Sequence, residues 1–216
     1  MFLDLFILIS RQFLEQMFKE NKYEIIKKAL SGEMANFLFT YLKLKKRVQD
    51  KMIEDNYLSP YNDDMGTYRD ELCQGVWSCY SDLANETLLS ILKSKVEKVA
   101  KCKLIEMYSY ARLYTKNSVL PKHKDREACA ISSTLNVGGD PWPIYLEPGI
   151  EIKLKPGDML LYSGCDLFHW REKFKGELCG QIFLHYNDIS QKKELNYDRR
   201  PFLGLPKLFR KAVDEL

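Results

Sequence analysis

The first half of the chain carries apolar residues at helical spacing. Over 31–53 they recur every three or four positions, and lysines and one arginine fill the positions between them. This periodicity predicts an amphipathic helix that begins at Ser31. A stretch rich in Pro, Asn, Asp and Gly over 58–66 predicts a loop. A second helix is expected from Asn85, as its N-cap, to about Val99.

After Lys103 the pattern changes to short runs in which apolar and polar residues alternate. Such alternation is typical of strands, especially where Gly and Pro separate the runs. Strands are expected at 103–114, 129–137, 144–154, 158–162 and 178–186, with turns at Gly138-Gly139, Pro148-Gly149 and Pro156-Gly157. Helices followed by a run of strands predict helices packed against one face of a closed or double-layered sheet. Residues 191–216 are expected as a tail, in which 199–204 forms a strap over the body.

The N-terminal decapeptide MFLDLFILIS is apolar but lacks the features of a signal peptide. It contains Asp4, has no basic front end and offers no small-residue cleavage site before Arg11. It is also too short to span a bilayer. Two interpretations stay open: residues 1–16 form a helix that packs on the body, or they lie upstream of a start at Met17.

Composition limits the class of protein. A chain of 216 residues, 45% hydrophobic and 29% charged, predicts one globular domain over 1–216. Within it, 1–102 is expected to give mainly helical support and 103–190 the strand core. The 33 basic and 30 acidic side chains leave a net charge of +3, too small to indicate nucleic acid or an anionic membrane as partner. Six irregularly spaced cysteines without a C-x-x-C pair predict reduced thiols in a cytoplasmic protein.

The chain has only three histidines, His123, His169 and His185. His123 and Asp125 are two positions apart at the end of a strand-like run, so their side chains project to the same side. His169 follows the strand expected at 158–162, where a barrel can bring it opposite the first pair. Two imidazoles and one carboxylate that leave other positions open are typical of non-haem Fe(II). A structural zinc site needs four protein ligands, which the chain does not obviously supply.

The triad alone is a weak signal. With three His and 14 Asp in 216 residues, an H-x-D pattern arises by chance in about one such sequence in five. Singly, each histidine is more often structural than a ligand, and His185 is interpreted as structural. Cys129 and Cys165, near the proposed ligands, are interpreted as inert core thiols. Trp142, between two prolines, is interpreted as a buried indole in a fixed turn.

A series of short motifs surrounds the triad. In order they are YSYARLY at 108–114, LPKHKDR at 120–126, ISSTLN at 131–136, WPIYL at 142–146, KPGD at 155–158, YSGC at 162–165, HWRE at 169–172 and QIFLHY at 181–186. In these motifs the chain resembles the Fe(II)- and 2-oxoglutarate-dependent dioxygenases, in the prolyl-4-hydroxylase-like branch and especially its phage and marine-bacterial members. The resemblance covers about half of the chain and is far more specific than the triad.

The resemblance implies a fold, a site and a reaction. The fold would be α+β, a double-stranded β-helix (a jelly-roll or cupin-like barrel) with N-terminal supporting helices. His123, Asp125 and His169 would be the catalytic iron ligands, and Tyr114 would donate its hydroxyl to the carboxylate of 2-oxoglutarate. The cofactors would be Fe(II), 2-oxoglutarate as co-substrate, and O₂. The reaction would hydroxylate an unactivated C–H bond and release succinate and CO₂.

The chain departs from the family pattern at one position. A Lys or Arg about ten residues past the second histidine pairs with the distal carboxylate of 2-oxoglutarate in that pattern, and here the position is Leu178 or Cys179. A buried dicarboxylate without a cation is costly, so another basic group is expected. Arg171 is the first candidate, because it lies two residues after His169 and a guanidinium binds a carboxylate through two hydrogen bonds.

Three further residues complete the expected co-substrate site. Arg112 is the second candidate cation, because it shares one strand face with Tyr114. Gln181 shares strand parity with Cys179 and is expected to face the same interior. Thr134, within the ISSTLN motif, is expected beside them.

The substrate is less defined than the cofactors. A peptide or small molecule is expected: a prolyl residue is the family default, and a free amino acid or another side chain is compatible with the triad. A modified nucleobase is disfavoured, because no basic, aromatic-lined groove is evident, and no membrane partner is expected. Two other classes stay open: a non-catalytic jelly-roll metal- or ligand-binding protein, and a zinc-dependent cupin-like hydrolase or isomerase. The oligomeric state is not indicated.

Overall fold

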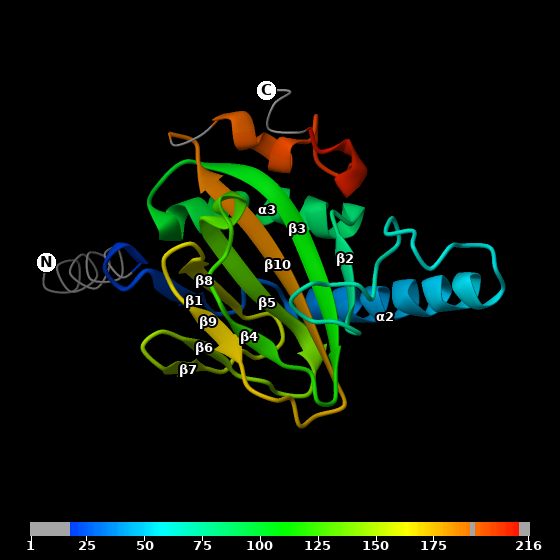
Figure 1. The fold of residues 1–216 in the computed structure, drawn as a ribbon. Helices are drawn as coiled ribbons and strands as arrows, with labels where there is room; N and C mark the ends of the chain where they lie inside the picture. The colour runs from blue at the N-terminus through cyan, green and yellow to red at the C-terminus, as the bar shows by residue number, and fades with distance from the viewer. Residues whose placement is uncertain (1–17, 191–192, 212–216) are drawn as a thin grey trace, which may run out of the picture.

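Two antiparallel sheets form the body of the molecule in the computed structural model, which describes residues 18–190 and 193–211 (Figure 1). The larger sheet has the strand order β1-β8-β5-β10-β3-β2, formed by β1 (Tyr23–Ile26), β8 (Met159–Ser163), β5 (Ile131–Gly139), β10 (Leu178–Asp188), β3 (Leu104–Thr115) and β2 (Trp77–Tyr80). The smaller sheet has the order β4-β9-β6-β7, formed by β4 (Leu120–His123), β9 (His169–Arg171), β6 (Ile144–Leu146) and β7 (Ile150–Ile152). The two layers make the double-stranded β-helix that the sequence indicated.

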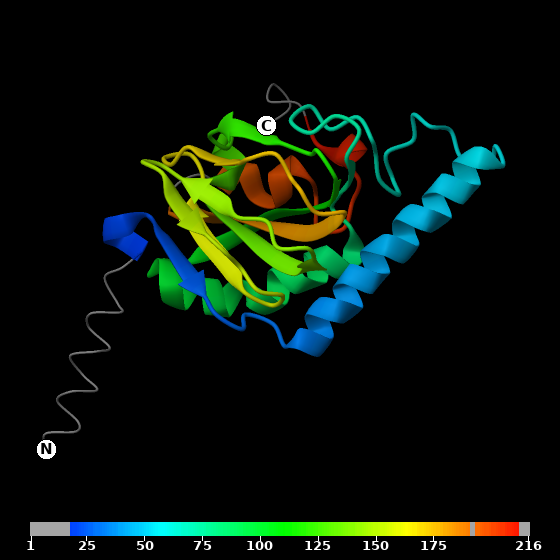
Figure 2. The same cartoon turned by 90° about the horizontal axis from the view of Figure 1, so that it is seen from below.

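Helix α2 (Gly32–Glu54) begins where the sequence predicts. Its N-cap is Ser31, whose hydroxyl accepts a hydrogen bond from the backbone N–H of Met34 at 3.1 Å. Ala35, Leu38 and Leu42 are buried along the face that packs on the larger sheet. Figure 2 shows the C-terminal part of α2 extending away from the sheets.

Helix α3 (Leu83–Ala100) starts earlier than predicted. Its N-cap is Asp82, whose Oδ1 accepts hydrogen bonds from the backbone N–H groups of Ala84 and Asn85 at 3.0 and 3.3 Å. The prediction of Asn85 as N-cap is therefore wrong, because the Asp82 carboxylate already satisfies the free N–H groups of the first turn. Asn85 is a buried residue of that turn.

Strand β10 shows how the sheet separates a helix-facing core from the barrel interior. Ile182, Leu184 and Tyr186 belong to the hydrophobic core that also contains residues of α2 and α3. The alternate residues of β10 point into the barrel, and they are Cys179, Gln181, Phe183 and His185. Polar side chains in this interior carry the candidate chemistry.

Three short strands, β1, β2 and β9, were not predicted, and β4 was indicated only as a strand-like run that ends near His123. Each has only three or four residues, and each gains its hydrogen bonds from a partner distant in sequence, as β1 does from β8. The strand expected at 144–154 is two strands, β6 and β7, joined through the turn at Pro148-Gly149. The formation of such short strands depends more on tertiary pairing than on the local pattern of apolar and polar residues.

The C-terminal segment lies over one end of β3 and β10 (Figure 1). It contains two short helical turns, η2 (Lys193–Arg199) and η3 (Lys207–Phe209), and a further turn, η1 (Glu127–Cys129), precedes β5. The strap expected over 199–204 is present, because buried Arg200 forms an ion pair with Glu86 at 3.2 Å. The two interpretations of 1–16 concern residues outside the described ones. No helix in the described part of the chain is long and apolar enough to cross a membrane.

Candidate functional site

The structure brings His123, Asp125 and His169 together. His123 ends β4, His169 begins β9, and the two are direct partners in the antiparallel register of these strands. Asp125 Oδ1 lies 3.5 Å from His169 Nε2 and 3.7 Å from His123 Nε2. One candidate ligand atom from each residue lies within 4.8 Å of the others. These atoms can therefore share one metal ion.

Backbone carbonyls orient both imidazoles. His123 Nδ1 lies 2.8 Å from the carbonyl oxygen of Pro121, and His169 Nδ1 lies 3.2 Å from that of Leu167. A carbonyl can only accept, so each Nδ1 carries a proton and each Nε2 is the ring nitrogen that faces Asp125. Hydrogen bonds of this kind orient histidine ligands in metal sites.

The charges of the three groups suit a cation. Burial raises the pKa of Asp125, but the hydrogen bond and charge of His169, with a hydrogen bond from Ser132, outweigh it and hold the pKa below its usual range. Burial and the neighbouring His169 lower the pKa of His123. At neutral pH the carboxylate is charged and His123 is neutral, which are the forms that bind metals.

Arg171 lies deeper in the barrel, two residues along β9 from His169. Its side chain is 1% exposed, and burial lowers its pKa. Nη1 donates to the carbonyl oxygen of Trp142 at 2.5 Å, Nη2 lies 3.5 Å from Thr134 Oγ1, and Nε has no hydrogen-bond partner. Within residues 18–190 and 193–211, no carboxylate forms an ion pair with Arg171.

Thr134, Gln181 and Tyr114 surround the same interior. Thr134 Oγ1 donates to Gln181 Oε1 at 3.0 Å, and both side chains are buried. The Tyr114 ring packs edge-on against Trp142 at 4.8 Å between centroids, and the Arg171 guanidinium lies 5.1 Å above that indole. Burial raises the pKa of Tyr114 to about 12, so its hydroxyl is protonated and can donate. The prediction of a buried indole at Trp142 is confirmed.

Arg112 lies in the same interior but already has an anion. Its Nε and Nη2 donate to the Asp70 carboxylate at 2.7 and 3.2 Å, and its Nη1 donates to the Tyr114 hydroxyl at 3.3 Å. The Asp70 carboxylate also accepts a hydrogen bond from the Tyr110 hydroxyl. Of the two candidate cations, only Arg171 lacks a partner of opposite charge.

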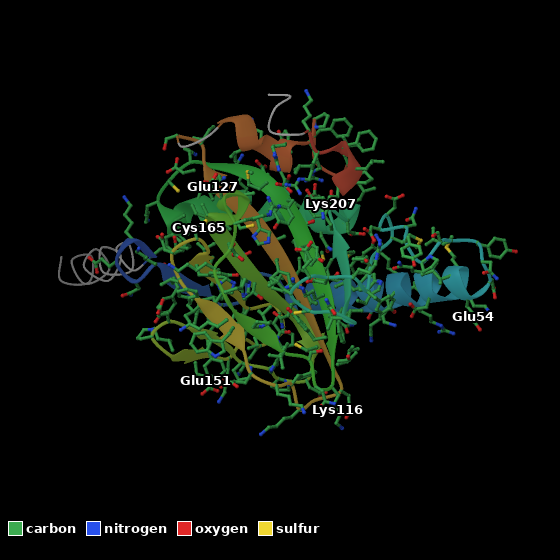
Figure 3. The ribbon with its side chains drawn as sticks, in the orientation of Figure 1. Glu54, Lys116, Glu127, Glu151, Cys165 and Lys207 are labelled. Carbon is green, nitrogen blue, oxygen red and sulfur yellow. The ribbon has the colours of Figure 1, made fainter. Side chains whose placement is uncertain are left out.

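A cleft of about 950 Å³ connects the triad with the surface. Its walls include Tyr108, Tyr110 and Arg112 from β3, the loop residues 61–72, and the C-terminal segment 204–210. Lys207, labelled in Figure 3, lies at the end of the barrel that the cleft reaches, and Lys116 lies at the opposite end. The cleft therefore gives a bound molecule access to the triad, whereas Arg171 is not among the residues that line it.

Comparison with known proteins gives a fold and no sequence relative. No family model matches the chain, and no curated protein matches it. A prolyl-4-hydroxylase from Pseudomonas putida matches with a TM-score of 0.53 at 12% identity, over 81% of this chain and 97% of that one. HygX from Streptomyces hygroscopicus, solved with nickel and 2-oxoglutarate bound, matches with a TM-score of 0.57 at 13% identity, over 80% of this chain and 85% of that one. EctD from S. alaskensis, in its apoform, matches with a TM-score of 0.60 at 15% identity, over 90% of this chain and 83% of that one. This chain shares their fold.

Within this double-stranded β-helix, Leu178 and Cys179 supply no cation. Leu178 packs toward the helix-facing core, and the Cys179 thiol is buried and accepts a hydrogen bond from Gln181 at 3.2 Å. Burial raises the pKa of Cys129 and of Cys165, which agrees with unreactive thiols. Cys129 is a core residue as expected, but Cys165 is only half-buried, so its interpretation as a core thiol is wrong. The roles of the predicted site residues stay predictions.

Sequence reasoning missed three residues beside the triad. Ser132 donates a hydrogen bond to Asp125, the hydroxyl of Tyr162 lies 3.4 Å from His169 Nε2, and Asp70 pairs with Arg112. His185, interpreted as structural, lies 3.0 Å from Ser132 Oγ through its Nδ1. Strand parity was an available signal. Ser132 shares one side of β5 with Thr134, and His185 shares one side of β10 with Gln181, so both could have been placed in the barrel interior.

Proposed function

We propose that the protein is an Fe(II)- and 2-oxoglutarate-dependent dioxygenase that hydroxylates an unactivated C–H bond. His123, Asp125 and His169 supply two imidazole nitrogens and one carboxylate oxygen that lie close together, and all three residues line the cleft. This donor set with open positions suits non-haem Fe(II) better than a structural zinc site, which takes four protein ligands.

The observation that carries the proposal is the unpaired guanidinium of Arg171. A buried charge without a partner costs several kcal/mol, so a fully buried arginine with a free Nε indicates an anion that completes the site. A dicarboxylate bound to the metal at one end would place its other carboxylate in this interior. Arg171 can hold that carboxylate through paired hydrogen bonds, with the Tyr114 hydroxyl as a further donor.

The bound groups perform the oxidation, and the chain positions them. Fe(II), 2-oxoglutarate and O₂ together supply the oxidising chemistry, in which 2-oxoglutarate gives succinate and CO₂ and a substrate C–H bond is hydroxylated. His123, Asp125 and His169 would hold the metal. Arg171, Tyr114, Thr134 and Gln181 would orient the co-substrate, and Trp142 helps to exclude water because its indole covers Arg171.

The substrate is proposed as a peptide or a small molecule, with a prolyl or other amino-acid residue as the site of oxidation. The cleft supports a polar substrate, since tyrosine hydroxyls and paired charges such as Arg112–Asp70 and Arg69–Asp63 form its walls. We place the activity in the cytoplasm, where reduced thiols are expected, because all six cysteines are free.

The test is anaerobic reconstitution. Addition of Fe(II) and 2-oxoglutarate to the purified protein should produce a weak visible charge-transfer band, and exposure to O₂ should release succinate slowly without substrate. His169→Ala should show neither signal. Absence of both signals from intact folded protein contradicts the proposal and favours a non-catalytic binding protein. Tightly held zinc with no response to 2-oxoglutarate would instead favour a hydrolase or isomerase.

A further inference from the structure

The two oxygens of Asp125 have different environments. Oδ1 faces the imidazoles, 3.5 Å from His169 Nε2 and 3.7 Å from His123 Nε2. Oδ2 accepts a hydrogen bond from Ser132 Oγ at 2.6 Å. A charged acceptor at this distance makes a strong hydrogen bond. One oxygen is therefore free for a metal, and the other is held by the protein.

Ser132 receives a hydrogen bond in turn from His185. A serine hydroxyl has one proton, and the Asp125 carboxylate is a stronger acceptor than the Cys129 carbonyl, which lies 2.9 Å away. With that proton directed at Asp125, Ser132 Oγ can only accept from His185 Nδ1 at 3.0 Å. The chain of donors therefore runs from His185 to Ser132 to Asp125. The imidazole of His185 is itself held at 4.5 Å by the ring of Tyr108.

Gly164 closes the other side of the carboxylate. Its carbonyl oxygen accepts from the backbone N–H of Asp125 at 2.9 Å. A Cβ at Gly164 would lie 2.3 Å from Asp125 Oδ2 and 2.7 Å from Ser132 Oγ, far inside any permitted contact. The hydrogen bond between Ser132 and Asp125 therefore fits only because residue 164 has no side chain.

We propose that Ser132, His185 and Gly164 form a carboxylate clamp that presents Asp125 to the metal through Oδ1 alone. A carboxylate that binds through both oxygens occupies two coordination positions, so the clamp keeps one more position open for the co-substrate. The three are positioning residues, since they act through Asp125. This inference rests on the proposed metal site and deepens it.

The test compares two neighbouring serines of β5. Ser132→Ala removes the hydroxyl that holds Asp125, whereas Ser133→Ala removes an equally buried hydroxyl on the other face, which donates to the Leu184 carbonyl at 3.1 Å. Co(II) affinity is measured by calorimetry and the coordination mode by the visible bands of bound Co(II). Ser132→Ala should bind Co(II) about 10- to 100-fold more weakly than wild type, with shifted bands. Ser133→Ala should match the wild type in both.

A second pair of variants keeps the test valid if Ser132→Ala does not fold. His185→Asn retains an N–H donor near the position of Nδ1, and His185→Leu does not. His185→Leu should weaken Co(II) binding and His185→Asn should preserve it. Gly164→Ala should weaken binding as Ser132→Ala does, because the new methyl group displaces Oδ2.

Two failures have different meanings. If wild-type protein binds no Co(II), or binds it equally well as His169→Ala, the proposed metal site is wrong. If binding depends on His169 but Ser132→Ala and Ser133→Ala have equal affinities and spectra, the metal site stands and the carboxylate clamp is overturned. If His185→Leu and His185→Asn bind Co(II) equally well, His185 has no role in the carboxylate clamp.

Discussion

Replacement of Arg171 by methionine separates a role in co-substrate binding from a role in folding. Methionine keeps much of the length of the side chain and removes the charge. In the free protein this removes a buried cation with no ion-pair partner among the described residues, but it also leaves the Trp142 carbonyl without its donor. The two effects oppose each other, so the free energy of unfolding should change by less than about 2 kcal/mol.

The effect on 2-oxoglutarate binding should be much larger. The loss of a buried, doubly hydrogen-bonded cation opposite a carboxylate costs about 2–5 kcal/mol, which raises the Kd about 30-fold to several thousand-fold. Mn(II)-loaded protein without O₂ permits a calorimetric titration with 2-oxoglutarate. In a parallel melting experiment, 2-oxoglutarate at 100 times the wild-type Kd should stabilise the wild type by about 2.7 kcal/mol. The variant should keep about 0.9 kcal/mol of this stabilisation if its Kd rises 30-fold, and almost none at the upper end of the range.

Arg112→Met is the matched control. It leaves Asp70 buried without its cation, so it should destabilise the free protein by about 3–5 kcal/mol, which Arg171→Met should not do. The reasoning is refuted if Arg171→Met binds 2-oxoglutarate within about threefold of wild type. If Arg112→Met loses binding while folded and Arg171→Met retains it, Arg112 rather than Arg171 holds the distal carboxylate.

Three further predictions concern single side chains. Tyr114→Phe should weaken 2-oxoglutarate binding about 5- to 30-fold in the same titration through loss of one donor, and an unchanged Kd would remove Tyr114 from the site. Burial lowers the pKa of His185 to about 4, below the value of about 6.5 in an unfolded chain, so the unfolded state takes up a proton first as the pH falls. Metal-free protein should therefore lose up to about 3 kcal/mol of stability between pH 6.5 and 4, and urea unfolding of His185→Asn should show a smaller loss; equal losses would contradict this. Gln49→Leu leaves the Trp77 indole N–H and the Gly66 carbonyl without their partners, so the urea midpoint should fall by an amount that corresponds to about 2–4 kcal/mol, and an unchanged midpoint would show that these bonds contribute nothing.

Two of the strands that carry the candidate site, β3 and β10, could be predicted because each is a long run bounded by turn residues. Their bounds followed from the sequence to within two residues, and strand parity indicated that Arg112 and Tyr114 share one face and that Gln181 faces inward. The i and i+2 spacing of His123 and Asp125 in the same way indicated a shared direction.

Features that depend on distant partners were not predictable. β1 is a strand because it pairs with β8, about 135 residues later in the chain, and its four residues alone carry no clear signal. The pairing of Arg112 with Asp70, which leaves Arg171 as the unpaired cation, depends on the loop that brings Asp70 to β3. The contact of Ser132 with Asp125 needs both strand pairing and the absence of a side chain at Gly164.

The most direct measurement is a crystal structure of the protein grown without O₂ in the presence of Mn(II) and 2-oxoglutarate. We expect one Mn(II) bound by His123 Nε2, Asp125 Oδ1 and His169 Nε2, with the distal carboxylate of 2-oxoglutarate hydrogen-bonded to Arg171. Metal bound elsewhere, or an empty interior beside Arg171 at saturating 2-oxoglutarate, would contradict the proposed function.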